Sequence, residues 1–334
     1  MDFTLTEDQT LLRDTARNVL TKQCPPSLLR AHIEDPAAAA PLWEHLRAYA
    51  GLGGGAATDL CLFLEETGYV AAPGPFFASS ALFAPVLAAL GHGLLDDVQA
   101  GTTTGTVAIA GTKGEWLPNN DTTKTFVLEA DRADHIAIIQ GSGDVVLAPA
   151  AAAAERLRFV ESVDTSRRVF ELDAQGIEGE RCSLAPDAIG RVLDIAYVAL
   201  AAEMVGTARR IFDMAVAYAK ERYQFDRPIG SFQAIQHKLA DDALALERST
   251  AAVHYAAMTV DAGDPERTRA CHVAKAAAGD AARRALKDGI QVHGGIGYTW
   301  EHDLHLYLRR ATGDEYLLGQ TGWHHDRIAD LLFA

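Results

Sequence analysis

The chain has 334 residues, 49% of them hydrophobic, so it can bury a sizeable core in one large domain or in two to three smaller ones. Its 30 Lys and Arg against 45 Asp and Glu give a formal net charge of −15, which repels phosphate backbones and argues against a nucleic-acid partner. Four scattered cysteines without ligand spacing, no basic-then-apolar leader and no apolar run of about 18 residues predict a cytoplasmic protein without a membrane partner.

The apolar periodicity divides the chain into three parts. Residues 1–100 carry helical patterns, with Thr6 placed to cap the first helix. Residues 101–185 contain short β-rich runs separated by turn residues, as in an antiparallel sheet. Residues 186–334 return to long helical patterns, the first of which is apolar on almost every side and is therefore expected inside a bundle. The predicted fold class is α+β, mainly α, with an N-terminal helical domain, a middle antiparallel β domain and a C-terminal four-helix bundle.

Two motifs in the last part carry the strongest functional signal. "RYQFDRPIGSFQAIQHKLAD" (222–241) and "QVHGGIGYT" (291–299) resemble two signatures of the acyl-CoA dehydrogenase family, and the opening "MDFTLTEDQ" is similar to that family's usual start. The resemblance covers nearly the whole chain. It implies an FAD enzyme in which a glutamate takes a proton from Cα of an acyl-CoA thioester and flavin N5 takes a hydride from Cβ.

In the family, the two motifs reach across a dimer interface to hold the ADP half of a neighbour's FAD. Carried over to this sequence, the resemblance implies seven cofactor-binding residues: Arg222, Gln224, Phe225, Gln233, Gln291, Gly294 and Gly295. A forked guanidinium suits a pyrophosphate, and glycines permit close backbone approach to phosphate. The alternative is that the glycines only cap a helix and Arg222 only pairs with an acid. Asp226 stands where the family usually has Gly and adds negative charge near the phosphates.

The catalytic base of the family has no counterpart at its usual position. The segment "RATGDEYLLGQTG" aligns Arg310 with the arginine of the family's R-D-A triplet, and it places Gly319 where the glutamate would be. A smaller branch carries its base on the first bundle helix, and that position is Ala196 here. We therefore predict no catalytic residue in this chain. Glu203 and Glu315 are the foremost substitutes, followed by Asp194 and Asp314, although a buried acid can equally be a structural hydrogen-bond acceptor.

Other expected features are also missing or weak. The β-rich part lacks the family's "TEPxxGSD"-like and Trp-Ile-Ser/Thr segments, which lie along the flavin ring, and the first part lacks a "PEEYGG"-like stretch. No metal site is predicted, because His324 and His325 would point about 100° apart on a helix and no Cys or Glu cluster accompanies them. We expect both histidines at the surface or at an interface.

Taken together, the resemblance implies a subunit of a heteromeric FAD-dependent acyl-CoA dehydrogenase that is inactive alone. Its expected partner is a catalytic subunit in an α2β2 complex, which binds most of the acyl-CoA, and the candidate electron acceptor is an electron-transfer flavoprotein. Short members of this kind resemble partner subunits of actinobacterial enzymes that act on CoA thioesters of steroid side chains. Two alternatives stay open: a self-sufficient homotetramer with a non-standard base, and a flavin-free regulatory or scaffold protein of the same fold.

Overall fold

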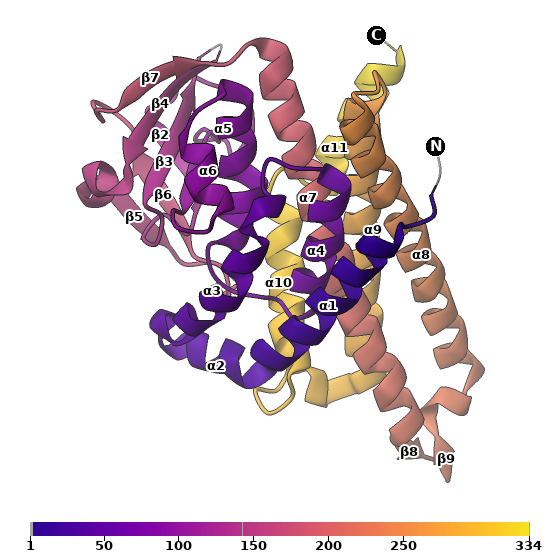
Figure 1. The fold of residues 1–334 in the computed structure, drawn as a ribbon. Coiled ribbons are helices and arrows are strands. Elements are labelled where there is room, and N and C mark those ends of the chain that lie inside the picture. The colour runs from indigo at the N-terminus through magenta and orange to yellow at the C-terminus, as the bar shows by residue number, and fades with distance from the viewer. Residues whose placement is uncertain (1–2, 142, 334) are drawn as a thin grey trace.

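The computed structural model describes residues 3–141 and 143–333, and it begins with a set of packed helices (Figure 1). Thr6 caps the first helix as predicted: its hydroxyl accepts from the Gln9 amide, and the Gln9 side chain accepts from the Thr6 amide. The helices are α1 (Glu7–Gln23), α2 (Pro26–Glu34), η1 (Pro36–Ala39), α3 (Ala40–Leu46), η2 (Arg47–Leu52), α4 (Ala57–Tyr69), η3 (Phe77–Phe83), α5 (Ala84–Leu90) and α6 (Leu94–Gln99).

The middle of the chain forms two small sheets. One has the strand order β1-β3-β4-β7 and the other β2-β6-β5. An apolar core containing Ile136, Ile138, Val127 and Leu172 lies between them. The pairs are antiparallel as expected, except that β1 runs parallel to β3. The elements are β1 (Gly105–Ala108), β2 (Thr123–Leu128), β3 (His135–Gln140), β4 (Asp144–Pro149), η4 (Ala150–Arg156), β5 (Leu157–Val160), β6 (Val169–Asp173) and β7 (Glu180–Ser183).

The last part is a helical bundle built on α7, which runs through the centre of the molecule (Figure 1). α7 packs against α8, α9 and α10, and α9 also packs against α11. Within the described ranges, no helix is long and apolar enough to cross a bilayer. The elements are α7 (Pro186–Glu221), β8 (Tyr223–Gln224), β9 (Arg227–Pro228), η5 (Ile229–Ser231), α8 (Gln233–Ala262), α9 (Arg267–His293), η6 (Gly294–Tyr298), α10 (Leu304–Tyr316) and α11 (Thr321–Phe333).

A close helix crossing joins the N-terminal helices to the bundle. A Cβ atom added at Gly68 of α4 would lie 1.9 Å from the Glu203 carbonyl oxygen, and one at Gly206 of α7 would lie 1.9 Å from the Glu65 carbonyl oxygen. Only glycine permits this approach of the two backbones. The apolar core is accordingly continuous from α4 and η3 through α7 to α9 and α10. The crossing places Glu203 at the junction between the helices and the β domain.

Candidate functional site

The two motifs predicted to hold a cofactor meet at one end of the bundle, where the β8–β9 hairpin projects beyond α7 and α8 (Figure 1). The Tyr218 ring of α7 stacks on His293 at the end of α9, with 4.6 Å between centroids. Lys238 of α8 donates to Asp288 of α9 at 2.6 Å. A small apolar cluster completes the join, with Ala215, Ala219, Val292, Tyr218, Ile229, Ile235 and Leu239.

The first motif forms a two-residue hairpin turn. Gln224 pairs with Arg227 across the hairpin, and the turn residues Phe225 and Asp226 have φ angles of 54° and 61°. Such a turn requires left-handed backbone at both positions, which glycine adopts freely and aspartate tolerates better than most residues. Asp226 therefore keeps the turn and adds one negative charge at its tip. The Phe225 side chain is 86% exposed.

The side chains expected to contact a cofactor face solvent. All seven anchor residues are exposed: Arg222, Gln224, Phe225, Gln233, Gln291, Gly294 and Gly295. Arg222 makes no ion pair with any residue that the structure describes. Gly294 has φ 65° and does end α9, whereas an added Cβ at Gly295 would meet nothing within 4 Å. Gln224 donates its side-chain amide to the Tyr223 carbonyl at 2.8 Å. Packing within the described residues leaves the Arg222 guanidinium and the space beside Gly295 open to an external ligand, which fits an ADP group.

The turn at the usual base position is held in a conformation that suits only glycine. Gly319 has φ 94°, and an added Cβ would lie 2.6 Å from the Trp323 ring. Lys275 of α9, which is fully buried, donates to the Gly319 carbonyl at 3.1 Å, and His324 contacts the Leu318 carbonyl at 2.9 Å. Burial lowers the pKa of Lys275 to about 8, so it remains a cation at neutral pH. The backbone here has no room for a glutamate side chain.

Glu315, the second suggested substitute, ties this turn to α11. Its carboxylate accepts from the Thr321 amide at 3.1 Å and from the Thr321 hydroxyl at 3.2 Å. Gly279 of α9 allows the approach, because an added Cβ there would lie 2.6 Å from the Glu315 carboxylate. The carboxylate satisfies one backbone amide and one hydroxyl at the start of α11, which is a structural use of an acid.

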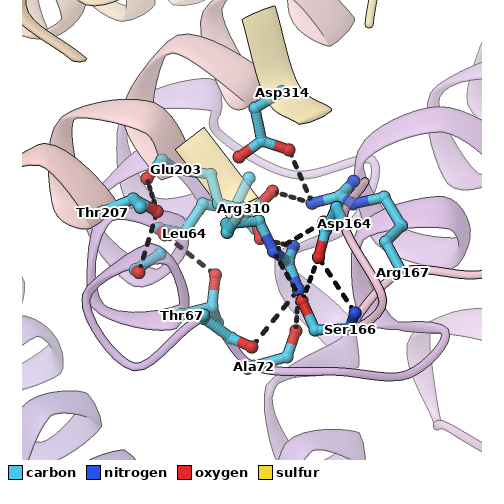
Figure 2. Close-up of polar contacts among 12 residues, drawn as sticks. Leu64, Thr67, Ala72, Asp164, Ser166, Arg167, Glu203, Thr207, Arg310 and Asp314 are labelled. Atoms are coloured by element: carbon cyan, nitrogen blue, oxygen red, sulfur yellow. Dashed lines mark hydrogen bonds and ion pairs between the residues drawn. The ribbon is translucent and has the colours of Figure 1, made fainter. Parts of the chain in front are cut away.

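Glu203, the first suggested substitute, lies in a buried ionic junction of three segments (Figure 2). Its carboxylate accepts from Arg167 at 2.6 Å and from Arg310 at 3.1 Å. Arg310 also lies 3.1 Å from Asp164, and all of these side chains are at most 6% exposed. The junction joins α7, α10 and the 161–168 segment of the β domain. A buried carboxylate held by two guanidiniums serves to join the segments that carry them.

Arg310 makes the most contacts in the junction. Beyond Glu203 and Asp164, it donates to the Ser166 hydroxyl at 3.1 Å and to the carbonyls of Ala71 and Ala72 at 3.2 and 3.0 Å. The sequence identified Arg310 only as an alignment landmark, and it gave no reason to select Arg167. The only signal for Arg167 is its place in a doublet of arginines beside a β-rich run.

Asp314 closes the junction from α10, with its carboxylate 3.5 Å from Arg167. It is fully buried, and neither oxygen has a hydrogen-bond donor among the described residues. Burial raises the pKa of Asp314 to about 7. The folded chain therefore keeps a proton on Asp314 that an unfolded chain releases near pH 4.

We expect Asp314→Asn to remove this linkage. Wild-type stability falls between about pH 4 and 7 by up to about 1.4 kcal/mol per pH unit from this group, and the variant lacks that loss. Urea unfolding at pH 5 and pH 8 measures the free energy of unfolding of both proteins. The variant's value minus the wild-type value should be larger at pH 8 than at pH 5. Equal differences at the two pH values would contradict the assignment.

The alternative base position offers no acid. Ala196 is 2% exposed in the core, so the position holds only a methyl group. The nearby Asp194 accepts from the Thr268 hydroxyl at 2.9 Å and lies 3.2 Å from Arg267, while burial raises its pKa to about 6. These contacts tie α7 to α9.

The expectation of two surface or interface histidines is wrong for His324. The His324 ring is fully buried, and its Nδ1 lies 2.7 Å from Nδ1 of His272. Burial lowers the pKa of His324 to about 2 and that of His272 to about 4, so both are neutral. Within the described ranges, no group of three or more His, Cys, Asp or Glu side chains is placed to hold a metal ion.

Comparison with known proteins identifies the family. The C-terminal domain model of the acyl-CoA dehydrogenases matches residues 187–333. Acyl-CoA dehydrogenase IpdE2 of Mycobacterium tuberculosis is 33% identical over 328 residues, which cover 93% of each chain. The chain belongs to the acyl-CoA dehydrogenase family. IpdE2 of Mycolicibacterium smegmatis is 31% identical and matches 94% of this chain and 96% of its own length.

The acyl-CoA dehydrogenase fold extends over the whole chain. A chain of the ChsE4-ChsE5 complex from Mycobacterium tuberculosis superimposes with a TM-score of 0.85 and 25% identity, covering 99% of both chains. A chain of a Tcur3481-Tcur3483 steroid ACAD variant gives a TM-score of 0.86 and 28% identity, covering 98% of both. The fold class predicted from the sequence is confirmed.

Proposed function

We propose that the chain is a subunit of a heteromeric, FAD-dependent acyl-CoA dehydrogenase, in which it supplies the ADP-holding contacts for the partner's FAD and no catalytic base. One observation carries the proposal. Exposed Arg222, Phe225 and Gly295 gather at the end of the bundle, while the base position is a glycine in a turn that a larger side chain cannot enter. The chain thus keeps surfaces for one half of a shared cofactor site and lacks the group that would start the reaction.

The contacts of Glu203 and Glu315 support the proposal that this chain supplies no catalytic base. A base must lie within about 2.6–3.2 Å, between heavy atoms, of the group that gives up the proton, and its carboxylate must not be taken up by structural contacts. Glu203 is bound by two guanidiniums, and Glu315 is bound by the start of α11. Bound flavin supplies the hydride acceptor of the reaction. The proton acceptor must then come from the partner chain.

The partner and the substrate class follow from the relatives. Two of the similar structures, ChsE4-ChsE5 and Tcur3481-Tcur3483, are each described by a pair of proteins. The Tcur3481-Tcur3483 pair is described as a steroid ACAD. We infer a second, base-carrying chain in an α2β2 complex and a bulky, steroid-type acyl-CoA bound mainly by that chain. An electron-transfer flavoprotein is the proposed acceptor. Flavin bound and turned over by the purified chain alone would support a self-sufficient enzyme, and a colourless complex would support a scaffold.

Arg222→Ala should weaken FAD binding by the heteromer. A charge-assisted hydrogen bond contributes roughly 1.5–3 kcal/mol, which corresponds to about a tenfold to hundredfold higher dissociation constant. Fluorescence of released FAD measures the change. The control is Lys220→Ala, which removes an exposed cation from the last turn of α7, two residues from Arg222. An unchanged FAD dissociation constant in Arg222→Ala counts against the assigned contact.

A further inference from the structure

Arg167 separates two hollows beside the base position. An inner cavity of about 10 Å3, room for about one water molecule, lies between the N-terminal helices and the β domain, lined by Phe77, Leu128, Glu203 and Arg310 among others. A more open apolar groove of about 240 Å3 lies on the other side, lined by Phe126, Val169, Gly313 and Leu317 among others. Arg167 is the one side chain that lines both hollows. It stands between them, and we call the space from the inner cavity through Arg167 to the groove the slot.

The slot has the location that a flavin ring would need in this chain. Dehydrogenation removes a proton and a hydride from adjacent carbons, so the base and the ring must approach one acyl chain with reacting atoms about 3–3.5 Å apart. A ring serving this chain's own base position would therefore lie next to the turn that contains Gly319. Gly313, Tyr316 and Leu317, just before that turn, line the groove. The opposite wall comes from β2 and β6 of the β domain.

Arg167 is fixed in the slot from three sides. Its guanidinium lies over the Phe77 ring of η3 at 4.7 Å, donates to Glu203 of α7 at 2.6 Å and lies 3.5 Å from Asp314 of α10. The residue is 6% exposed. An entering ring would have to displace a buried cation from the Glu203 carboxylate, the Asp314 side chain and the Phe77 ring. The ring half of an FAD site therefore does not fit this chain.

We propose that the Arg167 side chain occupies the place of the flavin ring, so that the chain's own FAD site is blocked by a side chain as well as lacking a base. The inference rests on the proposed function, because it assumes that the chain shares the family's placement of base and ring. It explains how a subunit can retain the ADP-holding motifs and yet hold no flavin of its own. It also gives the polar contacts around Arg167 a second role, which is to hold the Arg167 side chain in the place of the flavin ring.

The test uses lumiflavin, the flavin ring without its ribityl phosphate and ADP groups, and the full chain without its partner. Quenching of lumiflavin fluorescence should show no binding to the wild type. Arg167→Ala should bind lumiflavin with an affinity higher by about tenfold or more, since loss of the side chain extends the apolar groove inward and removes a buried cation. The control is Arg168→Ala, because Arg168 stacks on Phe159 and Phe170 away from both hollows.

A second variant guards against misfolding. Arg167→Ala leaves Glu203 with only one guanidinium partner, which could destabilise the fold. The double variant Arg167→Ala/Glu203→Gln removes one positive and one negative charge, so the net charge of the junction is unchanged. Failure of both folded variants to bind lumiflavin would overturn the proposal, and so would binding by the wild type. If neither variant folds, the wild-type measurement decides, with a flavin-depleted catalytic acyl-CoA dehydrogenase as the positive control. The number of FAD molecules in the heteromer tests the proposed function separately.

Discussion

Arg310→Ala should leave the chain unable to fold. Arg310 is 1% exposed, and its guanidinium contacts Glu203, Asp164 and the carbonyls of Ala71 and Ala72. Removing one partner of a buried ion pair costs about 3–5 kcal/mol, and each buried carbonyl left without a donor costs about 1–3 kcal/mol more. The sum approaches the roughly 5–15 kcal/mol of total stability that a domain has.

Circular dichroism and urea unfolding of the purified variant measure this effect. Arg309→Ala is the matched control, because Arg309 is the preceding residue on α10 but stacks on the exposed Trp300 ring at 4.9 Å. It should change stability by less than about 1 kcal/mol. A folded Arg310→Ala chain with a similarly small loss would show that the junction does not hold the three parts together.

Neutralising the partner's base should slow acyl-CoA-dependent flavin reduction by about 10²–10⁴-fold, the usual contribution of a general base. Glu203→Gln and Glu315→Gln in this chain should leave the rate of reduction unchanged in complexes that fold and retain FAD. Glu203→Gln will lower stability, because two buried guanidiniums then lose a charged acceptor. Stopped-flow absorbance of the reconstituted complex separates the chemical step from these losses.

The opposite pattern would refute the account of the acids. If Glu203→Gln or Glu315→Gln abolished reduction in a folded, FAD-loaded complex while the partner's Glu→Gln change did not, this chain would supply the base. Glu315→Gln is the easier of the two variants to interpret, since the contacts of Glu315 with Thr321 are hydrogen bonds that a glutamine can partly replace.

Local patterns predicted the parts of the molecule that depend on nearby residues. The capping of α1 by Thr6 and the three-part order of helices, strands and helices follow from neighbouring side chains and from periodicity. The parallel pairing of β1 with β3 did not, because strand order depends on how distant segments meet. Periodicity gives a strand's faces and says nothing of its neighbour's direction.

The buried charges were the least predictable feature. Arg167, Glu203 and Arg310 come from segments far apart in the sequence, and each looks like an ordinary charged residue in its own segment. Lys275 and His324 are likewise buried because α9 packs against α11 and against the turn that contains Gly319. Sequence position selected Gly319 through its family alignment, but the left-handed backbone that excludes a larger side chain emerged only from the fold.

The number of FAD molecules in the purified heteromer tests the central claim most directly. Each flavin site of the family needs one chain to hold the ring and a neighbour to hold the ADP group, and we propose that this chain provides only the second. Absorbance of released FAD against quantified protein should therefore give two FAD for an α2β2 complex. Four FAD for each tetramer would show that this chain holds a flavin of its own, and would contradict the account.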